Sequence, residues 1–334
     1  MAERGRRRRE AVGRLLAVLA LAAAPVAVAV AAYLAFESDD SPRGEPAIVA
    51  LGVGAPTARD EPEQPQDGPE PTVEGEPVPS VALDGVDAFH VALRRPPRAG
   101  LVFDVDTGEV LWRRRPLRVV SIASLTKIMT ALVVVEEARP GEAVRITPAA
   151  LRYQGSAIGL LPKGRRVRLE TLLNGLLIVS GNDAAIALAT RVAGSEARFV
   201  AAMNRRARHW GLGCTRFASS HGLEDGNRSC ARDLAVLARL AMANPRIRRI
   251  ARRREAAFRF PTKGGKLFLT GHNPLIRLGY PGAVGLKTGY TSAAGRCFVG
   301  VARRAERRLG VVLLNSRDPA KHAPKLLDAG FAAG

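Results

Sequence analysis

Apolar and polar residues follow regular spacings over much of the chain, and the pattern predicts both strands and helices. Residues 100–112 place two apolar runs on either side of an Asp-Thr-Gly turn, which predicts a β-hairpin. Residues 121–136 carry apolar side chains at 125, 128, 129, 132 and 133, the spacing of one helical face. Apolar runs at 297–301 and 309–314 predict two further strands.

A second helical region is interrupted by a short polar loop. Residues 169–179 form an apolar helical stretch that breaks at Ser180-Gly181-Asn182, and a second helix is expected to start directly afterwards. Asn182 or Asp183 suits its N-cap, because both side chains accept hydrogen bonds from free N–H groups. Ser180 and Asn182 are therefore expected in a loop between helices, where side chains can point into a cleft.

The N-terminal region divides into three parts by hydropathy and charge. Residues 1–14 hold six Arg and two Glu, and residues 15–36 are an uncharged run about long enough to cross a bilayer. Residues 37–85 hold twelve acidic residues and nine Pro, which predicts an extended, disordered linker. We expect a cytoplasmic basic tail, a membrane anchor or cleaved signal segment, and a linker, followed by a catalytic domain at 86–334.

This order predicts the location of the protein. Arginines before the apolar run are expected to keep the N-terminus in the cytoplasm, so the rest of the chain is exported. The expected location is the cell membrane, single-pass with the catalytic domain extracytoplasmic, or secreted if the N-terminal segment is cleaved.

Composition adds a strong positive charge. The 334 residues contain 51 Lys+Arg and 31 Asp+Glu, a net charge of +20, with 47% hydrophobic and 5% aromatic residues. Arginine clusters such as 248–254 have the charge of nucleic-acid sites, but export makes that partner unsuitable. An anionic cell-wall polymer, a membrane surface or a merely solvated basic face are the remaining interpretations.

Three cysteines are too few for a disulfide scaffold. Cys214 and Cys230 flank a turn-rich loop and are the favoured pair in an exported protein, which leaves a third cysteine either as a free thiol or for an intermolecular bridge. None of the cysteines has a histidine at metal-ligand spacing, and the five histidines show no ligand spacing either. We expect no metal and no cofactor; His221 and His272 are interpreted as hydrogen-bonded structural residues.

Ser124 and Lys127 are the first candidate catalytic residues. They lie three positions apart at the start of the predicted helix, on one face, so the lysine nitrogen can reach the serine hydroxyl. A serine hydroxyl needs a base to act as a nucleophile, and lysine serves as one when burial or nearby positive charge lowers its pKa. Ser-x-x-Lys alone is common by chance, and a capped helix with an exposed lysine is its ordinary explanation.

Two further motifs occur in a defined order after it. Ser180-Gly-Asn182 follows, and then Lys287-Thr-Gly289 in an extended segment, where the lysine provides a fixed charge and the glycine allows close approach of a substrate backbone. Ser-x-x-Lys, Ser-x-Asn and Lys-Thr-Gly, in this order, are typical of β-lactamases and penicillin-binding proteins.

The chain from about 90 to 332 resembles the D-alanyl-D-alanine carboxypeptidases, the low-molecular-mass serine penicillin-binding proteins. The resemblance includes Ala-Ser-Leu-Thr-Lys-Ile-Met-Thr around Ser124, Gly-Leu-Leu-Ile-Val-Ser-Gly-Asn-Asp-Ala-Ala around Asn182, His221-Gly-Leu, and Gly-Leu-Lys-Thr-Gly-Tyr-Thr-Ser-Ala-Ala-Gly from 285. It implies an α+β fold of the serine β-lactamase/DD-peptidase type, in which helices pack an antiparallel sheet beside a mainly helical lobe.

The resemblance also implies the role of each site residue. Ser124 would attack the peptide bond between two terminal D-alanines of a peptidoglycan stem peptide, and Lys127 would accept its proton. Ser180, held by Asn182 and Lys287, would pass a proton to the leaving D-alanine. Substrate binding would fall to the residues that follow Lys287 and to one distant arginine: Thr288, Gly289, Tyr290 and Arg317. The N–H groups of Ser124 and Tyr290 would bind the oxyanion, and β-lactam antibiotics would acylate Ser124.

Three alternatives remain open on the sequence. A β-lactamase of the same fold needs a glutamate that activates water, and Glu196 and Glu224 lack the expected context. An endopeptidase that cuts cross-links would use the same residues. A non-catalytic wall-binding protein would have no need of all five catalytic candidates.

Overall fold

The computed structural model describes residues 78–262 and 264–333. The predicted basic tail, the predicted membrane span and most of the predicted linker lie outside the described residues. Within residues 78–262 and 264–333, no helix has both the length and the apolar character needed to cross a bilayer.

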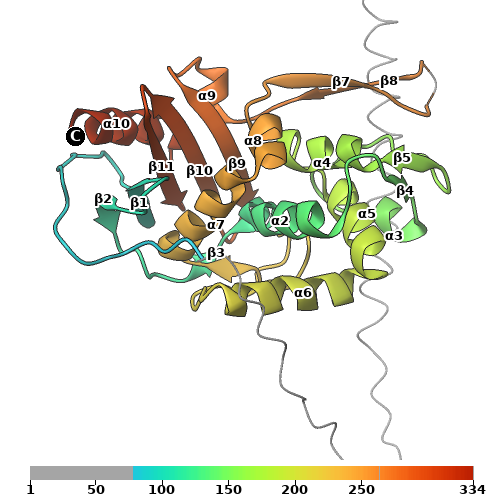
Figure 1. Ribbon diagram of the computed structural model, residues 1–334, viewed down its shortest axis with the longest axis horizontal. Coiled ribbons are helices and arrows are strands. Elements are labelled where there is room, and N and C mark those ends of the chain that lie inside the picture. The colour runs from blue at the N-terminus through green and yellow to red at the C-terminus, as the bar shows by residue number, and fades with distance from the viewer. Residues whose placement is uncertain (1–77, 263, 334) are drawn as a thin grey trace, which may run out of the picture. The chain divides into compact units, whose positions relative to one another are not determined.

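A five-stranded antiparallel sheet forms the centre of the domain, in the order β2-β1-β11-β10-β9 (Figure 1). The hairpin and both strands predicted from the sequence belong to it. β1 pairs with β11, with Ala99 opposite Leu314 and Asp104 opposite Leu309. The first strands of the domain are thus joined to its last ones. The bounds of the strands are β1 (Ala99–Asp104), β2 (Val110–Arg114), β9 (Ala283–Thr291), β10 (Gly295–Arg304) and β11 (Arg307–Leu314).

Helices cover both faces of this sheet, which is why β1 is buried along its whole length. Side chains alternate between the faces of a strand. Val102 therefore packs in the core beneath α9 and α10, whereas Leu101 and Phe103 belong to the larger core shared with the other helices. The covering helices are α9 (Pro274–Arg277) and α10 (Pro319–Ala332) on one face, and α7 (Ala231–Ala243) and α8 (Pro245–Ala251) on the other.

A mainly helical lobe packs beside the sheet (Figure 1). Its helices are α2 (Lys127–Glu137), α3 (Pro148–Leu151), α4 (Leu169–Ile178), α5 (Asn182–Ala193) and α6 (Glu196–His209). Three short antiparallel pairs complete the described domain: β3 (Val120–Ser121) with β6 (Arg228–Ser229), β4 (Ala143–Arg145) with β5 (Arg166–Arg168), and β7 (Glu255–Arg259) with β8 (Lys266–Thr270). The sheet and the helical lobe together give the α+β class expected.

Two helix starts differ from their sequence-based predictions. The helix expected from Ser121 begins instead as a 3₁₀ turn, η1 (Ala123–Thr126), and becomes α-helical at Lys127. Ala123 has a φ of +49°, a left-handed conformation that a continuous α-helix excludes. α5 begins one residue earlier than expected, so that Gly181 is its N-cap and Asn182 its first residue. The Asn182 side chain is therefore not used for capping.

Residues 78–85, the end of the predicted linker, lie against the catalytic domain. Val81 is buried in the larger core. Arg239 donates a hydrogen bond to the carbonyl of Ser80, and Arg113 donates one to the carbonyl of Gly85 at 2.8 Å. The packed part of the chain thus begins before residue 86.

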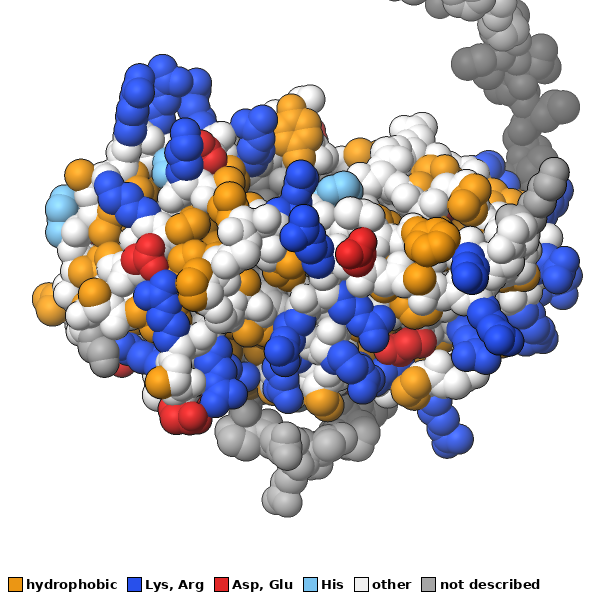
Figure 2. Space-filling view, turned by 90° about the horizontal axis from the view of Figure 1, so that it is seen from above, with side chains coloured by type: hydrophobic (Ala, Val, Ile, Leu, Met, Phe, Trp, Pro, Cys, Tyr) orange, Lys and Arg blue, Asp and Glu red, His pale blue; other side chains and the backbone are white. Residues whose placement is uncertain are grey.

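The surface of the domain is strongly basic. Lys and Arg side chains are spread over the whole face shown in Figure 2, with few Asp and Glu side chains among them. On the face shown, the Lys and Arg side chains do not form a single patch.

Candidate active site

The hydroxyl of Ser124 lies in η1, directly before α2. Oγ of Ser124 and Nζ of Lys127 are 2.9 Å apart, as the i,i+3 spacing predicts for one face of a helix. Ser124 is partly exposed, whereas Lys127 is completely buried. The pair therefore presents a reachable hydroxyl whose neighbouring amine is shielded from water.

The amine of Lys127 has two further acceptors. Its Nζ donates to Oδ1 of Asn182 at 2.7 Å and to the backbone carbonyl of His221 at 2.7 Å. Burial, with a smaller contribution from the charge of Lys287, holds the pKa of Lys127 well below its ordinary value. A lysine in this state can accept a proton from a serine hydroxyl at neutral pH.

Ser180 lies in the loop between α4 and α5. It is a non-glycine residue with a φ of +62°, a backbone conformation that costs about 1 kcal/mol or more and that is concentrated at functional sites. Its Oγ accepts a hydrogen bond from Nζ of Lys287 at 3.0 Å. The conformation places this hydroxyl in the same cleft as Ser124.

Lys287 lies on β9, in the extended segment that the sequence predicted. Its Nζ also donates to the carbonyl of Thr288 at 2.8 Å. Burial lowers the pKa of Lys287 to about 7. The site thus contains two buried lysines, each paired with a different serine.

The family resemblance led us to expect that Asn182 holds Ser180, but the Asn182 side chain has other hydrogen-bond partners. Its Oδ1 binds Lys127, and its Nδ2 donates to the carbonyl of Gln154 at 2.5 Å. Since Asn182 is the first residue of α5, its side chain points from the helix start toward α2. It orients the amine of the first pair and not the hydroxyl of the second.

The serines of the two pairs, Ser124 and Ser180, border one cleft of about 620 Å³. The substrate-binding candidates Thr288, Gly289, Tyr290 and Arg317 line it too, and Tyr290 and Arg317 are exposed. A Cβ added to Gly289 would lie 3.0 Å from the backbone nitrogen of Ser124. Glycine at this position therefore lets β9 lie close to the residue proposed to carry the acyl group. Four polar side chains that were not among the candidates line the cleft as well: Ser156, His272, Arg296 and Asp318.

Sequence reasoning did not identify the His221 carbonyl as a partner of Lys127. The residue after it, Gly222, has a φ of +86°, and a Cβ there would lie 2.1 Å from the carbonyl oxygen of Ala123. His221-Gly222-Leu223 is one of the strings that carried the resemblance. The tight packing of Gly222 explains the requirement for glycine. The contact of Lys127 with the His221 carbonyl could not be predicted, because a backbone carbonyl does not depend on the residue type.

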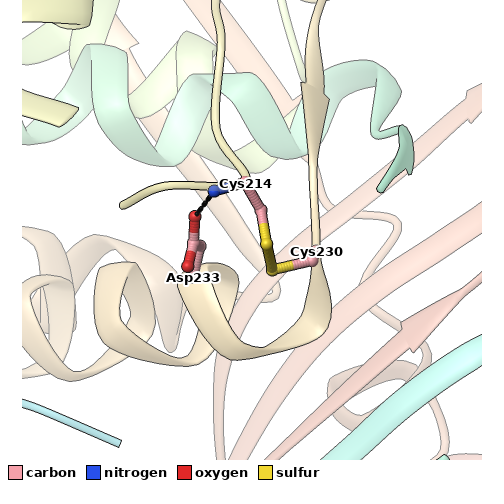
Figure 3. Close-up of side chains that lie close together, drawn as sticks. All are labelled: Cys214, Cys230 and Asp233. Carbon is pink, nitrogen blue, oxygen red and sulfur yellow. Dashed lines mark hydrogen bonds between the residues drawn. A yellow bond between two sulfur atoms is a disulfide. The ribbon is translucent and has the colours of Figure 1, made fainter. Parts of the chain in front are cut away.

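A disulfide closes the loop that contains His221. Cys214 and Cys230 are bonded, as favoured from the sequence, and Oδ2 of Asp233 accepts a hydrogen bond from the backbone nitrogen of Cys214 at 2.8 Å (Figure 3). Because the two sulfur atoms are bonded to each other, this cluster offers no thiolate to a metal. Cys297 is buried and free, and burial raises its pKa to about 11.

A serine paired with a buried lysine, beside a second serine–lysine pair in one cleft, defines a serine hydrolase that works by acyl transfer. The model of the D-alanyl-D-alanine carboxypeptidase family matches residues 96–318. The chain belongs to this family.

Individual relatives agree with this assignment. D-alanyl-D-alanine carboxypeptidase DacB2 of Mycobacterium tuberculosis is 37% identical over 71% of this chain and 83% of its own length. DacF of Bacillus subtilis is 34% identical over 70% of this chain but only 62% of its own length, so the chain spans less than two thirds of that relative. The crystal structure of the Streptomyces K15 DD-transpeptidase superposes with a TM-score of 0.67 at 30% identity, over 73% of this chain and all of that one.

Proposed function

We propose that this protein removes the terminal D-alanine from peptidoglycan stem peptides that end in D-Ala-D-Ala. The observation that carries the proposal is the 2.9 Å contact between Oγ of Ser124 and the buried Nζ of Lys127. It supplies a nucleophile and a base in one pair, and the D-alanyl-D-alanine carboxypeptidase family supplies the substrate class.

In the first step, neutral Lys127 takes the proton of Ser124 while Oγ attacks the carbonyl carbon between the two D-alanines. The resulting oxyanion would be bound by the backbone N–H groups of Ser124 and Tyr290. Such donors typically contribute about 10²–10³ in rate each. A Cβ on Gly289, the residue before Tyr290, would lie 3.0 Å from the backbone nitrogen of Ser124, so the strand that carries Tyr290 lies close to Ser124, which supports this assignment.

In the second step, the bond to the leaving D-alanine breaks and its nitrogen takes the proton of the Ser180 hydroxyl. Lys287 is within 3.0 Å of that hydroxyl and can replace the proton. Lys287 and Thr288, with Arg317 at the edge of the cleft, would bind the terminal carboxylate. Water then attacks the acyl-Ser124 ester; its proton restores Lys287, and as the ester bond breaks Lys127 returns its proton to Oγ of Ser124, which releases the shortened peptide.

β-Lactams would acylate the same serine, and this reaction provides the test. The detergent-solubilised full-length chain is exposed briefly to benzylpenicillin and followed for hours by intact-mass spectrometry. A lasting adduct of the drug's mass on Ser124, absent in Ser124→Ala, together with D-alanine release from a pentapeptide, is the expected result. Hydrolysis of the drug without an adduct would favour a β-lactamase, and neither adduct nor hydrolysis would favour a wall-binding protein.

We also propose that the apolar run 15–36 anchors the protein in the cell membrane, with its catalytic domain outside. The arginines before the run and its length support this arrangement. Fractionation of cells that express the full-length chain, followed by N-terminal sequencing, distinguishes an anchored protein from a cleaved and secreted one.

A further inference from the structure

The segment Ser219–Leu223, the His221 loop, lies between α2 and the beginning of α6. On the α2 side, two successive carbonyl groups accept hydrogen bonds. The carbonyl of Ser220 accepts from Oγ1 of Thr130 at 2.6 Å, and the carbonyl of His221 accepts from Nζ of Lys127 at 2.7 Å. The loop is thus one of the three groups that orient the catalytic amine.

On the α6 side of the loop, the carboxylate of Glu196 holds Ser220. Oε1 of Glu196 accepts hydrogen bonds from the backbone nitrogen of Ser220 at 3.0 Å and from its Oγ at 2.6 Å. The same oxygen lies 3.6 Å from Nε2 of His221. Glu196 is the first residue of α6, where the helix dipole favours a negative charge.

We propose that Glu196 is a positioning residue of the reaction, which keeps the His221 carbonyl directed at Lys127. This inference rests on the proposed function. The N–H of Ser220, which belongs to the Ser219–Ser220 peptide, and the Ser220 hydroxyl are both held by one oxygen of Glu196, so Ser220 cannot shift without breaking two hydrogen bonds. If Ser220 shifted, the carbonyl of the next residue, His221, would shift with it, and the buried amine of Lys127 would lose one of its three acceptors; a buried polar group without its partners is costly.

The histidine ring supports the same arrangement. Nδ1 of His221 accepts a hydrogen bond from the backbone nitrogen of Leu223 at 3.3 Å, so the neutral ring carries its proton on Nε2, which faces the carboxylates of Glu196 and Glu224. Burial keeps the pKa of His221 below its ordinary value, against these two carboxylates. A neutral ring adds no charge beside Lys127.

Other charges also face Lys127, and they limit what a change at Glu196 does to its pKa. Lys287 on β9 lowers it, whereas Asp183 on α5 and Glu224 after the His221 loop raise it. Glu196 influences Lys127 by holding the His221 loop in place and not by the electrostatic effect of its carboxylate on the pKa of Lys127. The decisive comparison is therefore between a variant that keeps the acceptor oxygen and one that removes it.

Asn204 offers a matched control. It lies on the same helix α6 and holds the same disulfide-closed loop, with its side chain bonded to the backbone nitrogen and the carbonyl of Phe217 at 2.9 Å each. Its contacts are with Phe217, and Glu196 contacts Ser220. Loss of either side chain loosens the connection between α6 and the loop, but only Glu196 contacts the residue next to His221.

The experiment uses the solubilised full-length chain and four variants: Glu196→Gln, Glu196→Ala, Asn204→Ala and, as a milder change that removes only the 2.6 Å hydrogen bond, Ser220→Ala. Acylation by a fluorescent penicillin and D-alanine release are measured across pH, with thermal unfolding alongside. We expect Glu196→Ala to lower kcat by about 10- to 100-fold with a smaller change in KM, the size of effect that a small displacement of catalytic groups produces. Glu196→Gln keeps an acceptor oxygen and should restore most of the rate, and Asn204→Ala should lower the melting temperature without this loss of kcat.

Equal losses of kcat in Glu196→Ala and Asn204→Ala would overturn the inference, because the effect would then be general loosening. A rate in Glu196→Gln as low as in Glu196→Ala would overturn it too. Crystal structures of wild type and Glu196→Ala test it without any assay: a His221 carbonyl still bonded to Lys127 in the variant excludes the proposal. If the wild type itself neither releases D-alanine nor forms an adduct, the proposed function fails, and these structures still decide the positioning.

Discussion

Lys287 lowers the pKa of Lys127, although each of the two buried amines binds a different serine. The two neighbouring lysines need opposite charge states. In the proposed reaction, Lys127 must be neutral to accept a proton, and Lys287 must be charged to attract a carboxylate. Because the positive charge of Lys287 disfavours a second positive charge nearby, it helps keep Lys127 in the neutral form.

Substrate binding should therefore weaken as the pH rises. The pKa of Lys287 is about 7, so its charge is lost above that pH in the free enzyme, and the attraction for a terminal carboxylate is lost with it. KM for a pentapeptide should rise between pH 7 and pH 9, whereas KM for the same peptide with an amidated C-terminus should change little. A KM for the free acid that stays flat over this range would contradict the assigned role of Lys287.

The stability of the folded protein should increase as the pH rises, whereas substrate binding weakens. Both lysines have folded-state pKa values below those of the unfolded chain, so between about pH 7 and 10 the unfolded state binds more protons. The free energy of unfolding then rises with pH, by at most about 1.4 kcal/mol per pH unit for each group. Urea unfolding at pH 7, 8 and 9 measures this slope. Lys287→Met should flatten it, and an unchanged slope in that variant would mean that Lys287 is charged in the folded protein.

Gly222→Ala should disrupt the site through a steric clash. The added Cβ would lie 2.1 Å from the carbonyl oxygen of Ala123, the residue before the nucleophile. We expect a loss of more than about 2 kcal/mol in unfolding free energy and a loss of penicillin acylation. Gly264→Ala is the control, since Gly264 has a similar φ of +89° but nothing within 4 Å of an added Cβ. Its cost should be the backbone strain alone, about 1–2 kcal/mol, with acylation unchanged. Similar acylation rates in the two variants would show that the clash is relieved without moving Ser124.

Loss of the disulfide should lower stability. Cys214 and Cys230 are 16 positions apart, and a cross-link that closes a loop of this size contributes about 3 kcal/mol in the chain-entropy description. Urea unfolding of Cys214→Ser/Cys230→Ser should show a loss of this order, with reduced acylation because the loop carries the His221 carbonyl. Cys297→Ser, which changes the free buried thiol, controls for the substitution itself. Full acylation by the double variant would mean that the His221 loop is held without the bridge.

Local patterns predicted much of the fold and the main site residues. The hairpin around the Asp-Thr-Gly turn and the helix that ends before Ser180 follow from spacings that are read within a few residues. The first residues of η1 and α5 were misplaced, because the left-handed Ala123 and the N-cap role of Gly181 depend on tertiary packing. Contacts between a side chain and a distant backbone group, such as that of Lys127 with the His221 carbonyl, could not be predicted from the sequence, since a carbonyl group is present at every position.

The pairing of β1 with β11 sets an order of events during synthesis. Asp104 and Arg307 are 203 positions apart in the chain, yet they lie in paired strands and form an ion pair. The sheet cannot close until the last strand has left the ribosome, and non-local pairing of this kind is slow. β9, which supports Lys287 and borders Ser124, is joined to β1 only through β10 and β11. An unfinished chain therefore lacks a complete cleft, so the proposed activity would begin only after the whole domain has been synthesised and folded.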